Sequence, residues 1–321
     1  MSTSTEEPRT AAPEGPPPKA VTRPADKIFA GSAKGAAILI LVVLAGVAAF
    51  LVAEAWPAIT ASAEEIPGGE GLVRYVWPLA FGTVLAATIA LIVATPLAVA
   101  IALFITHYAP RRVSQGLGYL IDLLAAVPSI IYGLWGFQVL APASVAFSAW
   151  LERNLGWLPF FEGPVSPTGR TMLVAGLVLA VMILPIITAV SREVFLQTPR
   201  LHEEASLALG ATRWEMIRQA VLPFGRSGII SGAMLGLGRA LGETMAVTIV
   251  LSVSGAVTFN LISSENPSTI AANIALQFPE SSGIDVNTLI ATGLVLFAIT
   301  LAVNMIARAV INRRREFSGA N

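Results

Sequence analysis

Six apolar runs, each long enough to cross a bilayer as a helix, constrain this chain more than any other feature. A membrane-spanning helix needs about 20 mostly apolar residues. The chain is 55% hydrophobic but only 12% charged, about half the charged fraction of a soluble domain. The sequence therefore predicts an all-α polytopic membrane protein with six transmembrane helices. The expected spans are 36–53, 79–106, 116–140, 171–190, 227–252 and 288–311.

The distribution of basic residues predicts the orientation of these spans. With a cytoplasmic N-terminus, sixteen of the twenty Lys and Arg residues fall in segments on the inside. The outside loops then hold only Arg74, Arg153 and Arg170. Because short cytoplasmic loops are enriched in Lys and Arg, we expect both termini to be cytoplasmic. The loops expected outside are 57–78, 141–169 and 253–287.

Composition also divides the chain and excludes some kinds of site. Residues 1–26 are rich in Pro, Ala, Thr and Glu and predict a disordered cytoplasmic tail, followed by a six-helix transmembrane domain over 27–321. The chain has no cysteine, which excludes disulfides and thiolate metal sites. The two histidines are too far apart in sequence to suggest a metal site, so none is expected. A net charge of zero gives no sign of nucleic-acid binding.

The fifth run carries an arginine and a glutamate within an apolar, glycine-rich stretch, 228–246. On a continuous helix, Arg239 and Glu243 would share one stripe with Gly228, Gly232 and Gly236. Charges inside a membrane are costly and usually face a partner or a water-filled path. We therefore expect Arg239 and Glu243 to line a translocation route. The alternative is a structural ion pair that locks the helix bundle.

Asp122 is the third candidate for the route, because it lies within the expected third span. It would sit about 9 Å from the start of that span, whereas Arg239 would lie about 18 Å into the fifth. A direct pair between Asp122 and Arg239 would therefore need side-chain reach or helix tilt. An aspartate hydrated near the cytoplasmic end of the span is an equally good interpretation.

The cytoplasmic connector 192–226 contains signals for two short helices. Thr198, with proline next, predicts the start of the first, and Gly210 predicts its end. The capping box from Thr212 to Glu215 predicts the start of the second, and Pro223 its end. The connector also has more apolar residues than a solvated loop needs, which favours a docking surface over a hairpin lying on the chain's own membrane domain. These residues are Leu209, Trp214, Ile217 and Val221.

Three stretches resemble one family of transporters. The series Glu204, Ala205, Ser206, Gly210, Ile217, Leu222 and Pro223 resembles the EAA loop of ABC-importer permeases, with Ser206 where many members have alanine. The stretch 239–247 (RALGETMAV) resembles the phosphate-specific (Pst) permeases, and its TMAV end resembles their C subunit. The stretch 127–134 (VPSIIYGL) matches the same subfamily. Together the resemblance covers about residues 35–315.

This resemblance implies a type I ABC-importer (MetI-like) permease fold in the plasma membrane. It also implies a complex with a second, A-type permease, two copies of a cytoplasmic ATPase and an extracytoplasmic phosphate-binding protein. The substrate would be inorganic phosphate, and ATP and Mg would be used by the ATPase chain. The docking residues would be Glu204, Ala205, Gly210, Trp214, Ile217, Leu222 and Pro223.

The sequence itself agrees that ATP hydrolysis belongs to another chain. No glycine-rich loop ending in Gly-Lys-Ser/Thr is present, so we expect a non-catalytic subunit with no cofactor of its own. Two other functions stay open. An ABC permease for sulfate or molybdate would have the same features, and a proton-coupled carrier could use Asp122 and Glu243 as relay groups. The connector argues against the carrier, which needs no ATPase dock.

Overall fold

The structure, a computed structural model, describes residues 24–315, so nearly all of the predicted tail lies outside the described residues. The chain divides into two units after Phe50. The first holds the beginning of α1, and the second holds the rest of α1 and all later elements. The α-helices are α1 Pro24–Thr60, α2 Leu72–Leu103, α3 Arg111–Ala125, α4 Ser129–Trp135, α5 Ala141–Leu155, α6 Met172–Leu196, α7 Arg200–Ala208, α8 Arg213–Met216, α9 Leu222–Leu241, α10 Met245–Val250, α11 Ile270–Gln277 and α12 Ile284–Arg315.

Short helical segments of other types join or flank several of these α-helices. Three of them are π-helical turns, η2 Phe104–Tyr108, η3 Gly136–Leu140 and η4 Ile217–Val221. Two are 3₁₀ turns, η1 Ala63–Glu65 and η5 Phe278–Glu280. Within the described residues the regular structure is helical, apart from an isolated bridge between Val253 and Asn266. The all-α prediction is confirmed.

Six helical stretches are long and apolar enough to cross a membrane, as predicted, but all differ somewhat in their boundaries and two of them, the third and fifth, are displaced along the chain. The six are Ala25–Thr60, Leu72–Tyr108, Ser129–Leu155, Met172–Leu196, Arg213–Leu241 and Ile284–Ala309. The predicted third span, 116–140, is wrong. Its first part belongs to the amphipathic helix α3, and the span starts after Pro128, which is the N-cap of α4. Residues predicted as loop, up to Leu155, extend the span instead.

The predicted fifth span, 227–252, is wrong at both ends. Pro223 does not end a helix, because it lies at the start of α9 directly after the π turn η4, which joins α8 to α9. Proline has no amide N–H to donate, and the helix continues through Pro223 with a local change to π geometry in η4. At the other end, α9 stops at Leu241 and Gly242 caps it. The helix from Arg213 is therefore continuous to Leu241, and α10 is a separate short helix.

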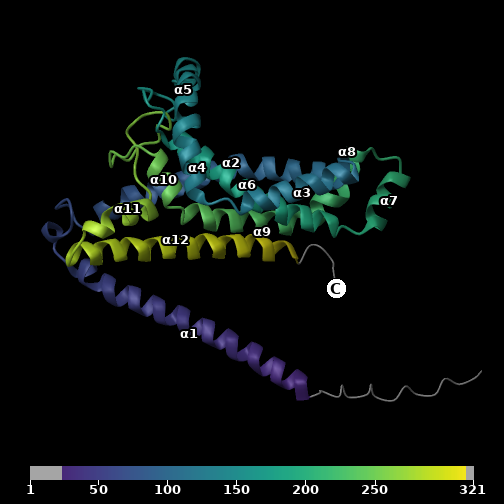
Figure 1. The fold of residues 1–321 in the computed structure, drawn as a ribbon, viewed down its shortest axis with the longest axis horizontal. Helices are drawn as coiled ribbons and strands as arrows, with labels where there is room; N and C mark the ends of the chain where they lie inside the picture. The colour runs from purple at the N-terminus through teal and green to yellow at the C-terminus, as the bar shows by residue number, and fades with distance from the viewer. Residues whose placement is uncertain (1–23, 316–321) are drawn as a thin grey trace, which may run out of the picture. The chain divides into compact units, whose positions relative to one another are not determined.

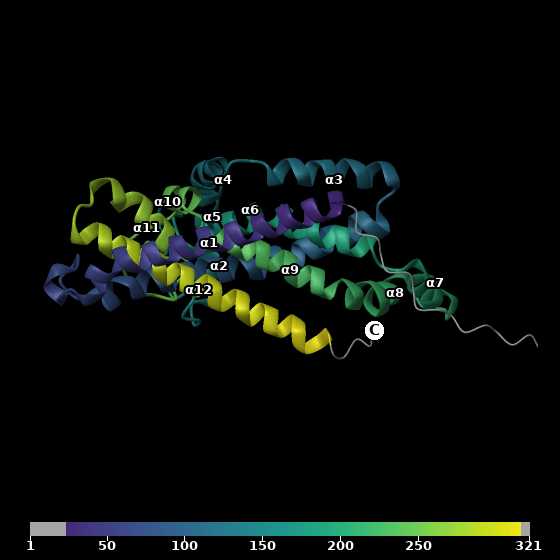
Figure 2. The same cartoon turned by 90° about the horizontal axis from the view of Figure 1, so that it is seen from below.

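Helix α6 lies at the centre of the second unit, between α2 and α9 (Figures 1 and 2). Helix α2 faces it with alanines at every fourth position, all buried: Ala86, Ala90, Ala94, Ala98 and Ala102. Helix α9 faces it with Gly225, Gly228, Gly232 and Gly236, which contact Phe195, Val194, Val190 and Ile187. Small residues let helix backbones approach closely, so these two stripes explain the tight packing around α6.

The α9 glycine stripe gives a stability prediction. A Cβ at Gly228 would overlap the side chain of Val194, whereas a Cβ at Gly238 on the same helix would meet open space. We expect Gly228→Ala to destabilise the detergent-solubilised protein by about 1–3 kcal/mol through overpacking. Gly238→Ala, the matched control, should be neutral or slightly stabilising because alanine favours helix. Thermal unfolding followed by tryptophan fluorescence measures both, and equal midpoints for the two variants would show that this stripe is not tightly packed.

The loop 57–78, the loop after α5 and the loop 253–287 lie at one end of the second unit, opposite α7 and α8, whereas α5, predicted as loop, is a helix that projects from the bundle (Figure 1). The loops after α5 and α10 are joined by backbone hydrogen bonds, from Ser166 N–H to Ile262 O and from Leu261 N–H to Phe160 O. The start of α2 joins the same end, where the Tyr75 hydroxyl bonds the side chains of Asn273 and Gln277. This arrangement agrees with placing all three loops on one face of the membrane.

Candidate functional site

Helix α9 presents two different faces along its length. The glycine stripe is buried against α6, and a second stripe of Ser231, Leu235, Gly238 and Gly242 is exposed. Gly238 has no neighbour that a Cβ would meet, so this second face borders open space. The glycines allow close packing against α6, but the predicted single stripe is wrong in part, because α9 ends at Leu241 and Glu243 lies beyond it.

Arg239 lies between these two faces, in the last turn of α9, and is partly buried. Its positive charge lies close enough to Tyr132 on α4 for an electrostatic interaction with the phenol. Within residues 25–309 the Arg239 guanidinium makes no hydrogen bond and no ion pair, and Glu243 is not its partner. An arginine in an apolar helix with its donors free is suited to bind an oxyanion, because the guanidinium is a planar fork of N–H groups.

Glu243 lies in the break between α9 and α10, and its residue is 8% exposed. One of its carboxylate oxygens accepts a hydrogen bond from the Ala246 amide, 3.0 Å away, in the first turn of α10. A carboxylate in this position satisfies a free amide and favours the positive end of the helix. Thr244 is the N-cap of α10, and Glu243, one residue earlier, supplies a side-chain acceptor to the first turn, a role that a continuous helix would not allow.

Helix α10 is held by contacts at both of its ends. At its start, Gly133 of α4 touches the backbone of Ala246 so closely that a Cβ would overlap it. At its end, the guanidinium of Arg170 donates to the carbonyl oxygens of Ile249, Val250 and Leu251 and lies over the ring of Phe137. The sequence predicts Arg170 to lie in an outside loop. Its contact with α10 was not predicted, because the only local signal is that Arg170 lies next to the start of a helix.

Asp122 lies apart from Arg239 and Glu243. It is exposed on α3, before the third span, and lines a cavity between α3, η2 and the end of α6. In Figure 2, α3 runs along one side of the unit and α12 along the other. Within the described residues no ion pair or hydrogen bond joins Asp122 to Arg239 or Glu243.

The connector forms the elbow of α7 and α8 at the opposite end from the outside loops (Figure 1). Gly210 ends α7 with φ of +85°, a conformation that glycine adopts without strain. The capping box is present, with Thr212 and Glu215 bonding each other's backbone amide. The predicted N-cap at Thr198 is wrong, since Pro199 holds that position and the Thr198 hydroxyl is buried without a hydrogen-bond partner.

The apolar residues of this elbow divide into an exposed and a buried set. Leu209 and Trp214 are 90% and 56% exposed, and Glu204 and Ala205 are exposed beside them. Ile217 is fully buried with Phe195, Met216 and Val221, and therefore holds the elbow to α6 instead of facing a docked protein. Leu222 is half-buried and Pro223 exposed.

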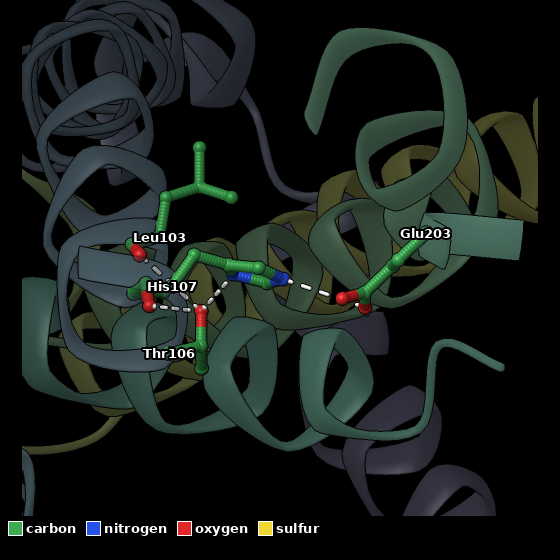
Figure 3. A network of polar contacts seen from close by, with 5 residues as sticks. Leu103, Thr106, His107 and Glu203 are labelled. Carbon is green, nitrogen blue, oxygen red and sulfur yellow. Dashed lines mark hydrogen bonds and ion pairs between the residues drawn. The ribbon is translucent and has the colours of Figure 1, made fainter. Parts of the chain in front are cut away.

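A second link, which the sequence does not predict, holds α7 (Figure 3). His107 of η2 is nearly buried, and its Nε2 lies 3.6 Å from Oε1 of Glu203 on α7. Its Nδ1 lies 2.7 Å from the Thr106 hydroxyl, which also donates to the Ala102 carbonyl oxygen. His107 and Glu203 are 96 positions apart, and isolated histidines and glutamates give no pattern from which to predict the contact.

Comparison with known proteins agrees with this architecture. Residues 94–316 match the family described as "binding-protein-dependent transport system inner membrane component". A Mycobacterium tuberculosis protein named phosphate transport system permease protein PstC 2 is 46% identical over 302 residues, covering 90% of this chain and 92% of that protein. A Mesorhizobium japonicum protein named PstC is 39% identical over 306 residues, covering 92% of each.

One solved structure shows the same fold at low sequence identity. It is a bacterial alginate ABC transporter in complex with an alginate-bound periplasmic protein. The TM-score is 0.60 at 15% identity, with 92% of this chain and 97% of that chain covered. The arrangement of helices around α6 is therefore that of an ABC-importer permease.

Proposed function

Because the chain belongs to the family of binding-protein-dependent inner-membrane transport components, and within it to the PstC-type permeases, we propose that it is a permease subunit of an ATP-driven phosphate importer. The observation that carries the proposal is Arg239, a partly buried arginine with free donors beside the open face of α9. Phosphate offers oxygens that match the guanidinium fork.

The route would pass Arg239 at the break between α9 and α10. Glu243 is held at that break by its bond to the Ala246 amide, and it would meet Arg239 only if the helices moved. One arginine does not balance a phosphate dianion, so a second permease, of the A type, would supply another cation. Asp122 faces a different cavity, and the route does not require it.

The elbow of α7 and α8 would receive the ATPase. Its exposed surface is formed by Glu204, Ala205, Gly210 and Trp214, with Pro223 nearby. Two copies of a cytoplasmic ATPase, using ATP and Mg, would serve this chain and its partner permease. An extracytoplasmic phosphate-binding protein would deliver substrate to the loops at the opposite end.

The orientation can be tested because the chain has no native cysteine. Ser282 is exposed in the loops predicted outside, and Leu209 is exposed on the elbow predicted inside. In intact cells, a membrane-impermeant maleimide should label Ser282→Cys directly, and Leu209→Cys only after permeabilisation. The reverse pattern would overturn the proposed topology.

The proposed function can be tested by purification and reconstitution. The tagged chain should co-purify with an ATPase and a second permease, and proteoliposomes holding this complex should take up phosphate only with ATP and the binding protein. Sulfate or molybdate taken up in preference to phosphate would support the oxyanion alternative. Uptake that persists without ATP and collapses with a proton ionophore would support a carrier.

A further inference from the structure

The cavity beside Asp122 has no part in the proposed route. It has a volume of about 270 Å³ and lies between η2, α3 and the end of α6. A single water needs roughly 10–15 Å³ of space accessible to its centre, so the cavity has room for a polyatomic ligand. Its polar lining consists of Thr106, Ser114, Gln115, Asp122 and Arg192.

Opposite charges line this cavity without pairing. Within residues 25–309, Arg192 and Asp122 make no ion pair with each other or with any other residue. The Nε of Arg192 is buried and has no hydrogen-bond partner, and the Ser114 and Gln115 side chains also make no hydrogen bond in that range. A buried donor without a partner is costly, and beside it the half-buried Ser114 and the exposed Gln115 have side chains free to donate, so the three together favour a bound acceptor.

Gly118 explains how the guanidinium comes to lie there. A Cβ at Gly118 would overlap Nη1 of Arg192, so the Arg192 head group packs directly on the backbone of α3. Gly116, two residues earlier on the same helix, has open space where its Cβ would be. The two glycines therefore form a matched pair, of which only Gly118 is needed to seat Arg192.

We propose that this cavity is a second binding site, for a protonated tetrahedral oxyanion, with inorganic phosphate as its ligand. Arg192 would bind two phosphate oxygens, and Ser114 and Gln115 would donate to the others. Asp122 is an acceptor when ionised, so it would take the hydrogen bond of a phosphate O–H. Sulfate has no proton to donate at neutral pH and would leave the carboxylate facing an anion, so the site would reject it.

The position of the cavity links this ligand to the docking elbow. Thr106 lines the cavity and its hydroxyl contacts His107, which in turn pairs with Glu203 on α7. A bound anion would add negative charge close to His107 and Glu203. The contact between these two residues would change, and the position of α7 in the elbow would change with it. The cavity lies at the end that the proposed orientation makes cytoplasmic, so phosphate inside the cell would act as a feedback inhibitor. This regulatory consequence rests on the proposed function, whereas the binding site does not.

Binding can be tested on the purified full-length chain, without other subunits, by calorimetric titration with inorganic phosphate and with sulfate. Phosphate should bind at least tenfold more tightly than sulfate. Arg192→Gln and Gly118→Ala should each weaken phosphate binding at least tenfold, and Gly116→Ala should not change it. Asp122→Asn should bring the phosphate and sulfate affinities together, because an amide can donate to sulfate. Absence of phosphate binding, or equal affinity in the two glycine variants, would overturn the proposal.

Two further measurements distinguish this site from the transport route and from a lipid site. Arg239→Gln should keep the calorimetric binding, and its loss in that variant would assign the phosphate to the route and overturn a second site. Native mass spectrometry tests for a lipid. If the wild type retained an anionic phospholipid that Arg192→Gln lost, the ligand would be a lipid head group and not free phosphate. In proteoliposomes, Gly118→Ala should keep the initial uptake rate at low internal phosphate but lose inhibition by high internal phosphate.

Discussion

Replacing Arg239 with glutamine is expected to reduce the rate of phosphate uptake about 100-fold or more, while the complex still assembles. The guanidinium makes no hydrogen bond or ion pair within residues 25–309, so its removal leaves no buried partner charge behind. The loss should therefore fall on transport and not on folding. Arg239→Lys should also fail, since an ammonium does not reproduce the bidentate fork. Uptake of radiolabelled phosphate, normalised to the yield of purified complex, measures the effect.

The control for Arg239 lies on the same helix. Arg226 is exposed near the start of α9, and Arg226→Gln removes the same charge without touching the break at Gly242. It should keep most of the uptake. If Arg239→Gln assembles and transports as well as Arg226→Gln does, Arg239 has no part in the route.

A valine at Gly210 is expected to uncouple ATP hydrolysis from transport, with uptake reduced at least tenfold. Gly210 has φ of +85°, and a Cβ added there would meet nothing within 4 Å, so the cost comes from the backbone alone. A β-branched residue resists this conformation by about 1–3 kcal/mol, and the turn between α7 and α8 would change shape. Gly210→Asn is the matched control, because asparagine tolerates the left-handed region.

The measurement for Gly210 compares ATPase activity and uptake in the same proteoliposomes. The valine variant should remain in the membrane at normal levels, since the residue is exposed and packs against nothing. Coupled transport equal to that of the asparagine variant would show that the turn is not a coupling element.

Two of the four local signals in the connector are confirmed, whereas the predicted helix start at Thr198 and helix end at Pro223 are wrong. The capping box at Thr212 and the glycine at 210 depend on neighbouring residues only, and both are confirmed. The boundaries of the membrane spans failed at prolines and glycines, whose effect depends on context. Pro128 lies at a helix start, where a missing N–H costs nothing, whereas Pro223 directly follows a π turn inside a continuous helix.

The candidate site was predictable in its residues but not in its geometry. Arg239 and Glu243 were conspicuous as charges in an apolar run, but the break at Gly242 puts them on different elements. The contacts of Arg170 with α10 and of His107 with Glu203 join residues about 80 to 96 positions apart. Such pairs follow from tertiary packing, and a single sequence carries no trace of them.

The continuity of the helix from Arg213 to Leu241 has a mechanical consequence. Trp214 on the elbow and Arg239 at the break are carried by one rod, with about 37 Å between them at 1.5 Å per residue. A tilt of this rod by about 5° around its middle would displace each end by about 1.6 Å, in opposite directions. A displacement of the elbow would thus be transmitted along the rod to Arg239.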